Sequence, residues 1–364
     1  MTAGTRTSSR AAAAPDRRHR QREGEPNLML LIAVDAGNSK TDVALVDTSG
    51  RILSTSRGGG FNAPASGVTA AVDMLGRLVD EVLEAAARTA ATMYGRRPGA
   101  PPVRHVSACL SNVDLPVEEE ELTLAVAERG WGRTVEVHND TFALLRAGLP
   151  ADSPRGVAVV CGAGINCVGI SGDGRTARLP AVGTLSGDWG GGGQLADEAI
   201  WYAARAADGR GDPTALARAL PRHFALDTMY ELITELHRGG IPDTRRHELV
   251  PVLFAVAGSG DRIARGLVHR QAEKIVSLAV VALSRLGLLQ EPVPVILGGG
   301  VLAARQLLLN DRVTELLAER APLARPVVVA APPVLGSALL GLDAIGAPRE
   351  TYRRLCAQFD VTVG

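Results

Sequence analysis

The hydrophobic positions of the chain fall into two similar series. Each series begins with an apolar run that ends in small residues at a tight turn, and a second extended run follows. These runs are residues 28–34 and 43–46 in the first series, and residues 157–161 and 167–170 in the second. Apolar runs of this length between turn residues are typical of β-strands. The pattern therefore predicts two β-hairpins about a domain length apart.

Further elements follow each hairpin. In the first series we expect strands at 51–54, 102–110 and 134–138, and helices at 68–89, 116–130 and 141–147. In the second we expect helices at 194–207, 213–220, 226–237, 247–257 and 262–286, strands at 294–297 and 327–330, and a last helical turn. Two units of β-β-β-α-β type, each opening with a glycine-bearing hairpin, predict a duplicated α/β architecture.

Composition changes along the chain suggest its domains. Residues 1–27 are rich in Ala, Arg, Ser and Pro without an apolar period, so we expect a disordered basic tail, and a start at Met29 would remove it. A turn-rich break near residue 150 separates an N-terminal domain, 28–150, from a C-terminal domain, 151–346. Residues 347–364 are expected to form a C-terminal helix that packs back on the N-terminal domain.

Composition and charge exclude several classes of partner. The 364 residues are 46% hydrophobic and 21% charged, and 39 basic residues balance 39 acidic ones. A zero formal net charge gives no general attraction to nucleic acid or to an anionic membrane. No apolar run approaches transmembrane length. The four cysteines lack metal-ligand spacing, so we expect small buried hydrophobic side chains in a reducing compartment, the cytoplasm.

The two hairpin turns are the first candidates for chemistry. Gly37 to Thr41 and Gly162 to Gly164 each present successive backbone N–H groups and small side chains at a strand end. Such a nest of amides suits phosphate. One turn alone would more often be an ordinary hairpin, but two suggest that the halves close on one polyphosphate.

Five motifs occur together in one order along the chain. They are Asp35-x-Gly37-x-Ser-Lys-Thr41, Asn139-Asp140, Gly162-x-Gly164-x-Asn166, Gly187-Asp188-x-Gly190 and Gly298-Gly-Gly300. This ordered set resembles the BadF/BadG/BcrA/BcrD-type ATPase family, which includes N-acetylglucosamine kinases and belongs to the actin-like, sugar-kinase and Hsp70 superfamily. The resemblance runs from about Met29 to Leu342. It implies duplicated ribonuclease H-like (actin-like ATPase) domains with a nucleotide cleft between them.

The resemblance also implies roles for individual residues. Asp35 would help to hold Mg²⁺; the alternative is that it only opens the turn. Asp140 would be the catalytic base; the alternative is that it only caps the helix that begins at Thr141. The residues expected to bind ATP are Gly37, Asn38, Ser39, Lys40, Thr41, Gly162, Ala163, Gly164, Ala257, Gly298, Gly299, Gly300 and Gly336. The residues expected to contact a sugar are Asn62, Ile165, Asn166 and Asp188. The partner would be a small sugar, and the family allows a homodimer.

Three departures from the family pattern concern the site. Ala163 stands where the kinases have a threonine, and Trp189 replaces the glutamate of Gly-Asp-Glu-Gly. The preceding Gly-Trp-Gly of the sugar kinases is here Ala181-Val-Gly183. The prediction is an ATP-dependent kinase that phosphorylates an amino sugar such as N-acetylglucosamine or glucosamine. The alternative is an ATPase without a sugar substrate, acting as a nucleotide-dependent switch or as an activator with an iron–sulfur cluster. The cysteine run of such activators is absent.

Overall fold

The computed structural model describes residue 1 and residues 29–94, 102–150 and 154–359, with the side chains of 90–94 excepted. The predicted basic tail lies outside the described residues. The first sheet contains β1 (Leu30–Ala36), β2 (Lys40–Asp47), β3 (Ile52–Gly59), β4 (Val103–Leu110) and β5 (Thr134–Asn139), in the order β3-β2-β1-β4-β5. The second contains β6 (Gly156–Cys161), β7 (Ile165–Ile170), β8 (Thr176–Arg178), β9 (Pro294–Gly298) and β10 (Arg325–Val328), in the order β10-β9-β6-β7-β8.

The two sheets have the same topology. In each, the first three strands pair antiparallel, and the first strand also pairs in parallel with the fourth. The fifth strand extends this parallel part of the sheet. This correspondence confirms the duplicated α/β architecture.

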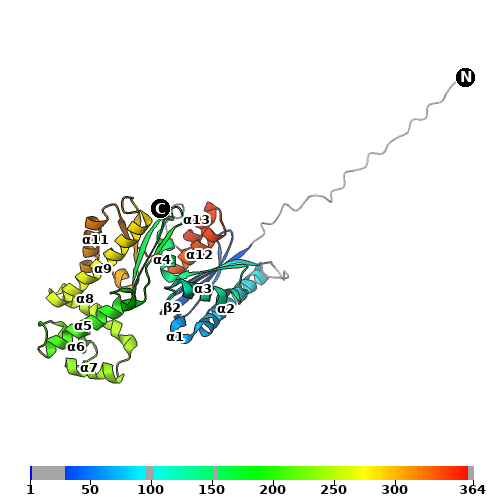
Figure 1. Ribbon diagram of the computed structural model, residues 1–364. Coiled ribbons are helices and arrows are strands. Elements are labelled where there is room, and N and C mark those ends of the chain that lie inside the picture. Colours follow the sequence, from blue (N-terminus) through cyan, green and yellow to red (C-terminus); the bar gives the residue numbers. More distant parts are fainter. Residues whose placement is uncertain (2–28, 95–101, 151–153, 360–364) are drawn as a thin grey trace.

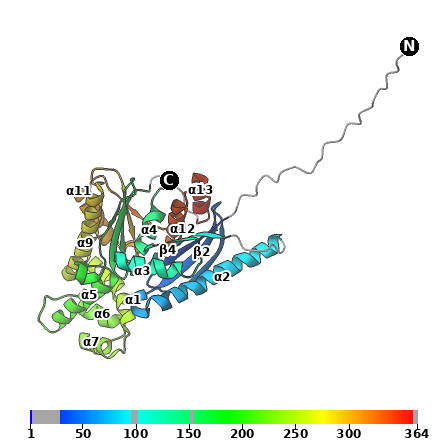
Figure 2. The ribbon, with the colours of Figure 1, turned by 45° about the vertical axis from the view of Figure 1, so that its right-hand side comes forward.

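Helices cover both faces of the first sheet. The helices of the first half are α1 (Ala63–Ser66), α2 (Val68–Tyr94), α3 (Pro116–Ala127) and α4 (Asp140–Gly148). Residues of α1, α2 and α3 pack on one face of the sheet, and C-terminal helices cover the other. Alternate residues of β1 point to opposite faces: Ile32 and Val34 pack with Leu75 and Val79 of α2, whereas Leu31 packs against the C-terminal helices. Figure 2 shows α2 running along the outside of the sheet.

The second half carries most of the helices. They are α5 (Gly192–Ala207), α6 (Leu216–His223), α7 (Met229–Arg238), α8 (Leu249–Gly258), α9 (Arg262–Leu286), α10 (Gly300–Ala303), α11 (Leu307–Arg320), α12 (Pro333–Ala344) and α13 (Arg349–Ala357), with short 3-10 helices η1 (Gly183–Ser186) and η2 (Asp243–Glu248). None of the helices in the described part of the chain is long and apolar enough to cross a membrane.

The halves exchange helices. Phe142 and Leu145 of α4, from the first half, pack with Ala158 and Ile296 of the second sheet. In return, Leu335 and the rest of the apolar face of α12 pack against the first sheet, together with α13 (Figure 1). The sequence placed α12 with the C-terminal domain, but its buried residues contact the other half. The boundaries predicted from composition remain a prediction.

Candidate functional site

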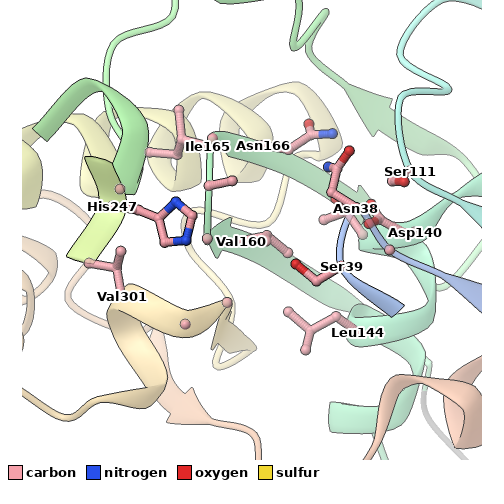
Figure 3. Close-up of a pocket in the computed structure, with 18 of the residues that line it drawn as sticks. Asn38, Ser39, Ser111, Asp140, Leu144, Val160, Ile165, Asn166, His247 and Val301 are labelled. Carbon is pink, nitrogen blue, oxygen red and sulfur yellow. The ribbon is translucent and has the colours of Figure 1, made fainter. Parts of the chain in front are cut away.

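A cavity of about 700 Å³ lies where the two halves meet. Figure 3 shows side chains from both halves around it, with Asn38, Ser39 and Asp140 from the first half. His247, Ile165 and Val301 come from three segments of the second half. The predicted site residues that line it are Asp35, Gly37, Asn38, Ser39, Lys40, Asp140, Gly162, Ala163, Gly164, Ile165, Asn166, Gly299 and Gly300. The structure thus brings together both glycine turns and the aspartates in one cavity.

The second glycine turn is built by close backbone packing. The amide of Gly162 donates to the carbonyl of Gly164 at 2.9 Å, and the amide of Gly192, at the start of α5, donates to the carbonyl of Gly162 at 2.7 Å. Gly191 has φ +88, and a Cβ there would lie 2.5 Å from the backbone of Gly164. Glycine is therefore required at position 191 for this contact, and the glycine run at the start of α5 is not a flexible linker.

Two carboxylates share one end of the cavity. Burial, reinforced by the negative charge of Asp140, raises the pKa of Asp35 to about 7. Burial and the charge of Asp114 raise the pKa of Asp140 to about 6. The charge of Asp140 thus acts on Asp35, and that of Asp114 acts on Asp140. A cation bound beside these carboxylates would relieve the repulsion between them.

Asn139, not Asp140, caps α4. The Asn139 side chain accepts from the amide of Thr141 at 2.9 Å, and Asp140 is the first helical residue. The alternative reading of Asp140 as a cap residue is therefore wrong, and the Asp140 carboxylate faces the cavity.

A third carboxylate, Asp114, was missed by the sequence analysis. Its Oδ1 accepts from Nδ2 of Asn139 at 2.9 Å and from Nδ2 of Asn166, in the other half, at 3.1 Å. Burial and nearby Glu118 raise the pKa of Asp114 to about 6, against the opposing effect of Arg178. The polar residues directly after the β4 strand, Ser111 to Asp114, were the available signal, because neighbouring parallel strands end at one edge.

The opposite end of the cavity is more apolar. It is lined by Val250, Pro251 and Phe254 of α8 and by Val301, with His247 and Gln306 at its margin. The hydrophobic pattern placed His247 and the α8 residues in a predicted helix, and it assigned Val301 and Gln306 to no element. All of these residues come from segments far from the glycine turns in sequence, so only the folded chain reveals their association with the site.

Several predicted residues lie outside the cavity lining. Asn62 is exposed and caps α1 through a 3.2 Å bond from the amide of Ala65. Asp188 accepts from the hydroxyl of Ser186 at 2.5 Å. Thr41 and Ala257 are fully buried.

Gly298 and Gly336 lack a Cβ for a packing reason. A Cβ on Gly298 would lie 2.4 Å from the side chain of Leu144, and a Cβ on Gly336 would lie 1.7 Å from the carbonyl oxygen of Ala143. Both glycines thus allow α4 to approach, and their expected role beside the nucleotide has no support from the cavity lining.

Trp189 is a core residue. Its indole is 7% exposed, its Nε1 donates to Glu198 at 3.0 Å, and the guanidinium of Arg270 lies 4.0 Å from the ring centroid. The Glu198 carboxylate thus accepts the hydrogen bond of the indole. The replacement of glutamate by tryptophan at position 189 is accommodated in the core, outside the cavity lining.

The four cysteines are free and buried. Burial raises the pKa of Cys161 to about 12 and raises that of Cys167 further. Thiols in this state are poor nucleophiles and poor metal ligands, as expected for small core residues.

Comparison with known proteins identifies relatives that cover most of the chain. The sequence model of the BadF/BadG/BcrA/BcrD ATPase family matches residues 32–341. An N-acetyl-D-glucosamine kinase of Dictyostelium discoideum is 25% identical over 319 residues, covering 86% of this chain and 98% of the relative. An N-acetylmuramic acid/N-acetylglucosamine kinase of Clostridium acetobutylicum is 22% identical, covering 75% and 85%.

A solved structure supports the fold assignment. A protein from Chromobacterium violaceum, provisionally named an N-acetylglucosamine kinase, superimposes with a TM-score of 0.63 at 22% identity and covers 87% of this chain and 100% of its own. The predicted fold class, duplicated actin-like domains, is confirmed by this likeness and by the matching sheets.

Proposed function

Because the chain belongs to the BadF/BadG/BcrA/BcrD ATPase family, we propose that it is an ATP-dependent kinase that phosphorylates a hydroxyl group of an amino sugar such as N-acetylglucosamine or glucosamine. One observation carries the proposal: a single cavity joins two glycine turns, one from each half, to a group of amide and carboxylate side chains. The two curated relatives above are named as kinases of these sugars.

The division of the cavity suggests how the substrates would bind. Phosphoryl transfer requires positioning and charge neutralisation more than covalent chemistry by the protein. Backbone amides of the Gly37 and Gly162 turns would hold the phosphates, and the apolar end with Val250 and Phe254 would take the base. Asn166 and Asp114 would then face the sugar.

Asp35 and Asp140 fit a magnesium ion. Each is a buried carboxylate whose pKa is raised by burial and by neighbouring negative charge. The described residues contain no group of three or more metal-ligating side chains. That suits Mg²⁺, which uses one or two carboxylates together with phosphate oxygens and water. When bound, the ion would neutralise phosphate charge.

Two carboxylates compete for the role of the proton acceptor. Asp140 was assigned this role from the sequence, but its charge raises the pKa of Asp35, so the two carboxylates lie near each other at the expected metal site. Asp114 is held by Asn166 and lies close enough to Asp188 to be affected by its charge. This position favours Asp114 for removing the proton of the sugar hydroxyl, with Asp140 beside the cation.

The first experiment measures ADP release from Mg-ATP with N-acetylglucosamine, glucosamine, N-acetylmannosamine and glucose. Strong stimulation by an amino sugar supports the proposal, whereas ATP binding with a flat response to all four sugars would favour a nucleotide-dependent switch.

Asparagine variants then identify the base. Replacing the true base should lower kcat by 10²–10⁴-fold with little change in the KM for ATP. Asp173→Asn, at the exposed turn before β8, is the control. If Asp114→Asn retains kcat and Asp140→Asn loses it, the assignment made from the sequence is correct.

A further inference from the structure

Arg178 connects the two halves of the molecule beside the cavity. It ends β8 of the second sheet, where its carbonyl accepts from Nη1 of Arg285 on α9 at 3.1 Å. Its side chain extends to the first half, where Nη2 donates to the carbonyl of Val113 at 3.1 Å and Nη1 donates to the carboxylate of Glu119. The backbone of Arg178 is thus fixed to one half and its guanidinium to the other.

The Val113 carbonyl directly precedes Asp114. The same carbonyl accepts from Nδ2 of Asn139 at 3.2 Å, and the amide of Asp114 donates to Glu118 at 2.9 Å. The backbone is therefore held on both sides of Asp114. From the half that carries the second glycine turn, Arg178 holds this backbone, whereas Asn166 holds the Asp114 side chain.

Glu119 is itself held in place. It accepts from Nδ1 of His138 at 3.2 Å, and the side chains of Glu119 and Arg178 are both 23% exposed. The guanidinium also lies 5.9 Å from the ring centroid of Phe142 on α4. A planar guanidinium can donate to a carbonyl and a carboxylate at once, whereas an ammonium is a single point of charge.

We propose that Arg178 is a positioning residue, which sets the place of the Asp114 loop relative to the glycine turn of the second half. The inference rests on the proposed function, because Asp114 matters for turnover only if a hydroxyl group is the acceptor. Nothing in the proposal requires Arg178 to contact either substrate.

The test uses the full chain with Arg178→Met and Arg178→Lys. The matched control is Arg175→Met, because Arg175 lies in the preceding turn and pairs with Asp173 in its own half at 2.8 Å. We expect Arg178→Met to lower kcat at least tenfold with the KM for ATP changed less than twofold. Arg178→Lys should recover part of the loss, and Arg175→Met should have kcat within twofold of wild type.

A second measurement does not depend on sugar turnover. Hydrogen exchange followed by mass spectrometry should show faster exchange of the amides of residues 112–119 in Arg178→Met, and no change there in Arg175→Met. If the wild-type protein shows no sugar-stimulated ADP release, the proposed function fails, and exchange alone then decides whether Arg178 holds this loop.

Two results would overturn the inference. One is unchanged exchange at residues 112–119 in Arg178→Met, even if its melting temperature falls. The other is faster exchange with kcat equal to that of Arg175→Met, since the loop would then not need Arg178 for turnover. If Arg178→Met does not fold, Glu119→Gln, which removes the charge but keeps the shape of the carboxylate side chain, takes its place with the same expected effects.

Discussion

Replacing Gly336 with alanine tests whether this residue serves the helix contact or the nucleotide. Gly336 lies on α12, and its ideal Cβ would lie 1.7 Å from the carbonyl oxygen of Ala143 on α4. A carbon and a carbonyl oxygen normally approach no closer than about 3.3 Å. The two helices would therefore have to separate by roughly 1.5 Å, because the obstructing atom belongs to the backbone.

The expected cost follows from two opposing effects. Forcing an extra methyl group into a packed contact costs about 3 kcal/mol at the upper end of the usual range, and the better helix propensity of alanine returns about 1 kcal/mol. The free energy of unfolding should therefore fall by about 2 kcal/mol. For domains of this size such a loss lowers the melting temperature by about 4–8 °C.

Gly266→Ala is the matched control for this variant. Gly266 also lies inside a helix, α9, but it is exposed, and a Cβ there would have no atom within 4 Å. It should gain about 1 kcal/mol from helix propensity alone. Thermal unfolding of both variants should therefore show shifts of opposite sign, and equal melting temperatures would refute the packing argument.

The ATP affinity of Gly336→Ala distinguishes a role of Gly336 in helix packing from a role in nucleotide binding. Because α4 begins at Asp140, displacement of α4 should also lower kcat. If Gly336→Ala kept wild-type stability but lost ATP affinity, the nucleotide role expected from the sequence would be correct.

Three further predictions concern the cavity. Because the pKa of Asp114 is raised to about 6, its carboxylate form is lost as the pH falls. The value of kcat/KM should therefore decrease tenfold per pH unit below pH 6. A profile that is flat from pH 5 to 8 would contradict a carboxylate base. Asp35→Asn should raise the Mg²⁺ concentration for half-maximal rate at least tenfold, measured at fixed ATP, and an unchanged titration would exclude Asp35 as a ligand. Ala163→Thr should lower the KM for ATP by about 2–10-fold, the value of one added hydrogen bond, unless the side chain at 163 faces away from the phosphates.

The hydrophobic pattern predicted most of the fold because its helical and strand spacings repeat regularly over long segments. Helix α9 was predicted with its observed bounds, Arg262–Leu286, since apolar residues recur at helical spacing over the whole segment. Helix α11, Leu307–Arg320, was not predicted, although four of its residues are buried. Helix α12, Pro333–Ala344, was expected only as a last helical turn. Pro333 occupies its first helical position, where proline is well tolerated.

The candidate site was predictable only where its residues stand next to each other in sequence. The glycine turns and Asp140 belong to compact motifs, and they do line the cavity. Asp114 was signalled only by its place shortly after a predicted strand. His247 and Phe254 carry no local signal of a shared site, because they join it only when the two halves pack. Conversely, Gly336 lies in a stretch of small residues that suggested a nucleotide site, but in the structure it packs against the backbone of α4.

The exchange of helices between the halves has a consequence for how the molecule can be divided. The segment 29–150 would place Phe142 and Leu145 in water, and it would lose the cover that Leu335 provides for β1. A gene split at the boundary near residue 150 should therefore yield two aggregation-prone fragments, which become soluble when they are produced together.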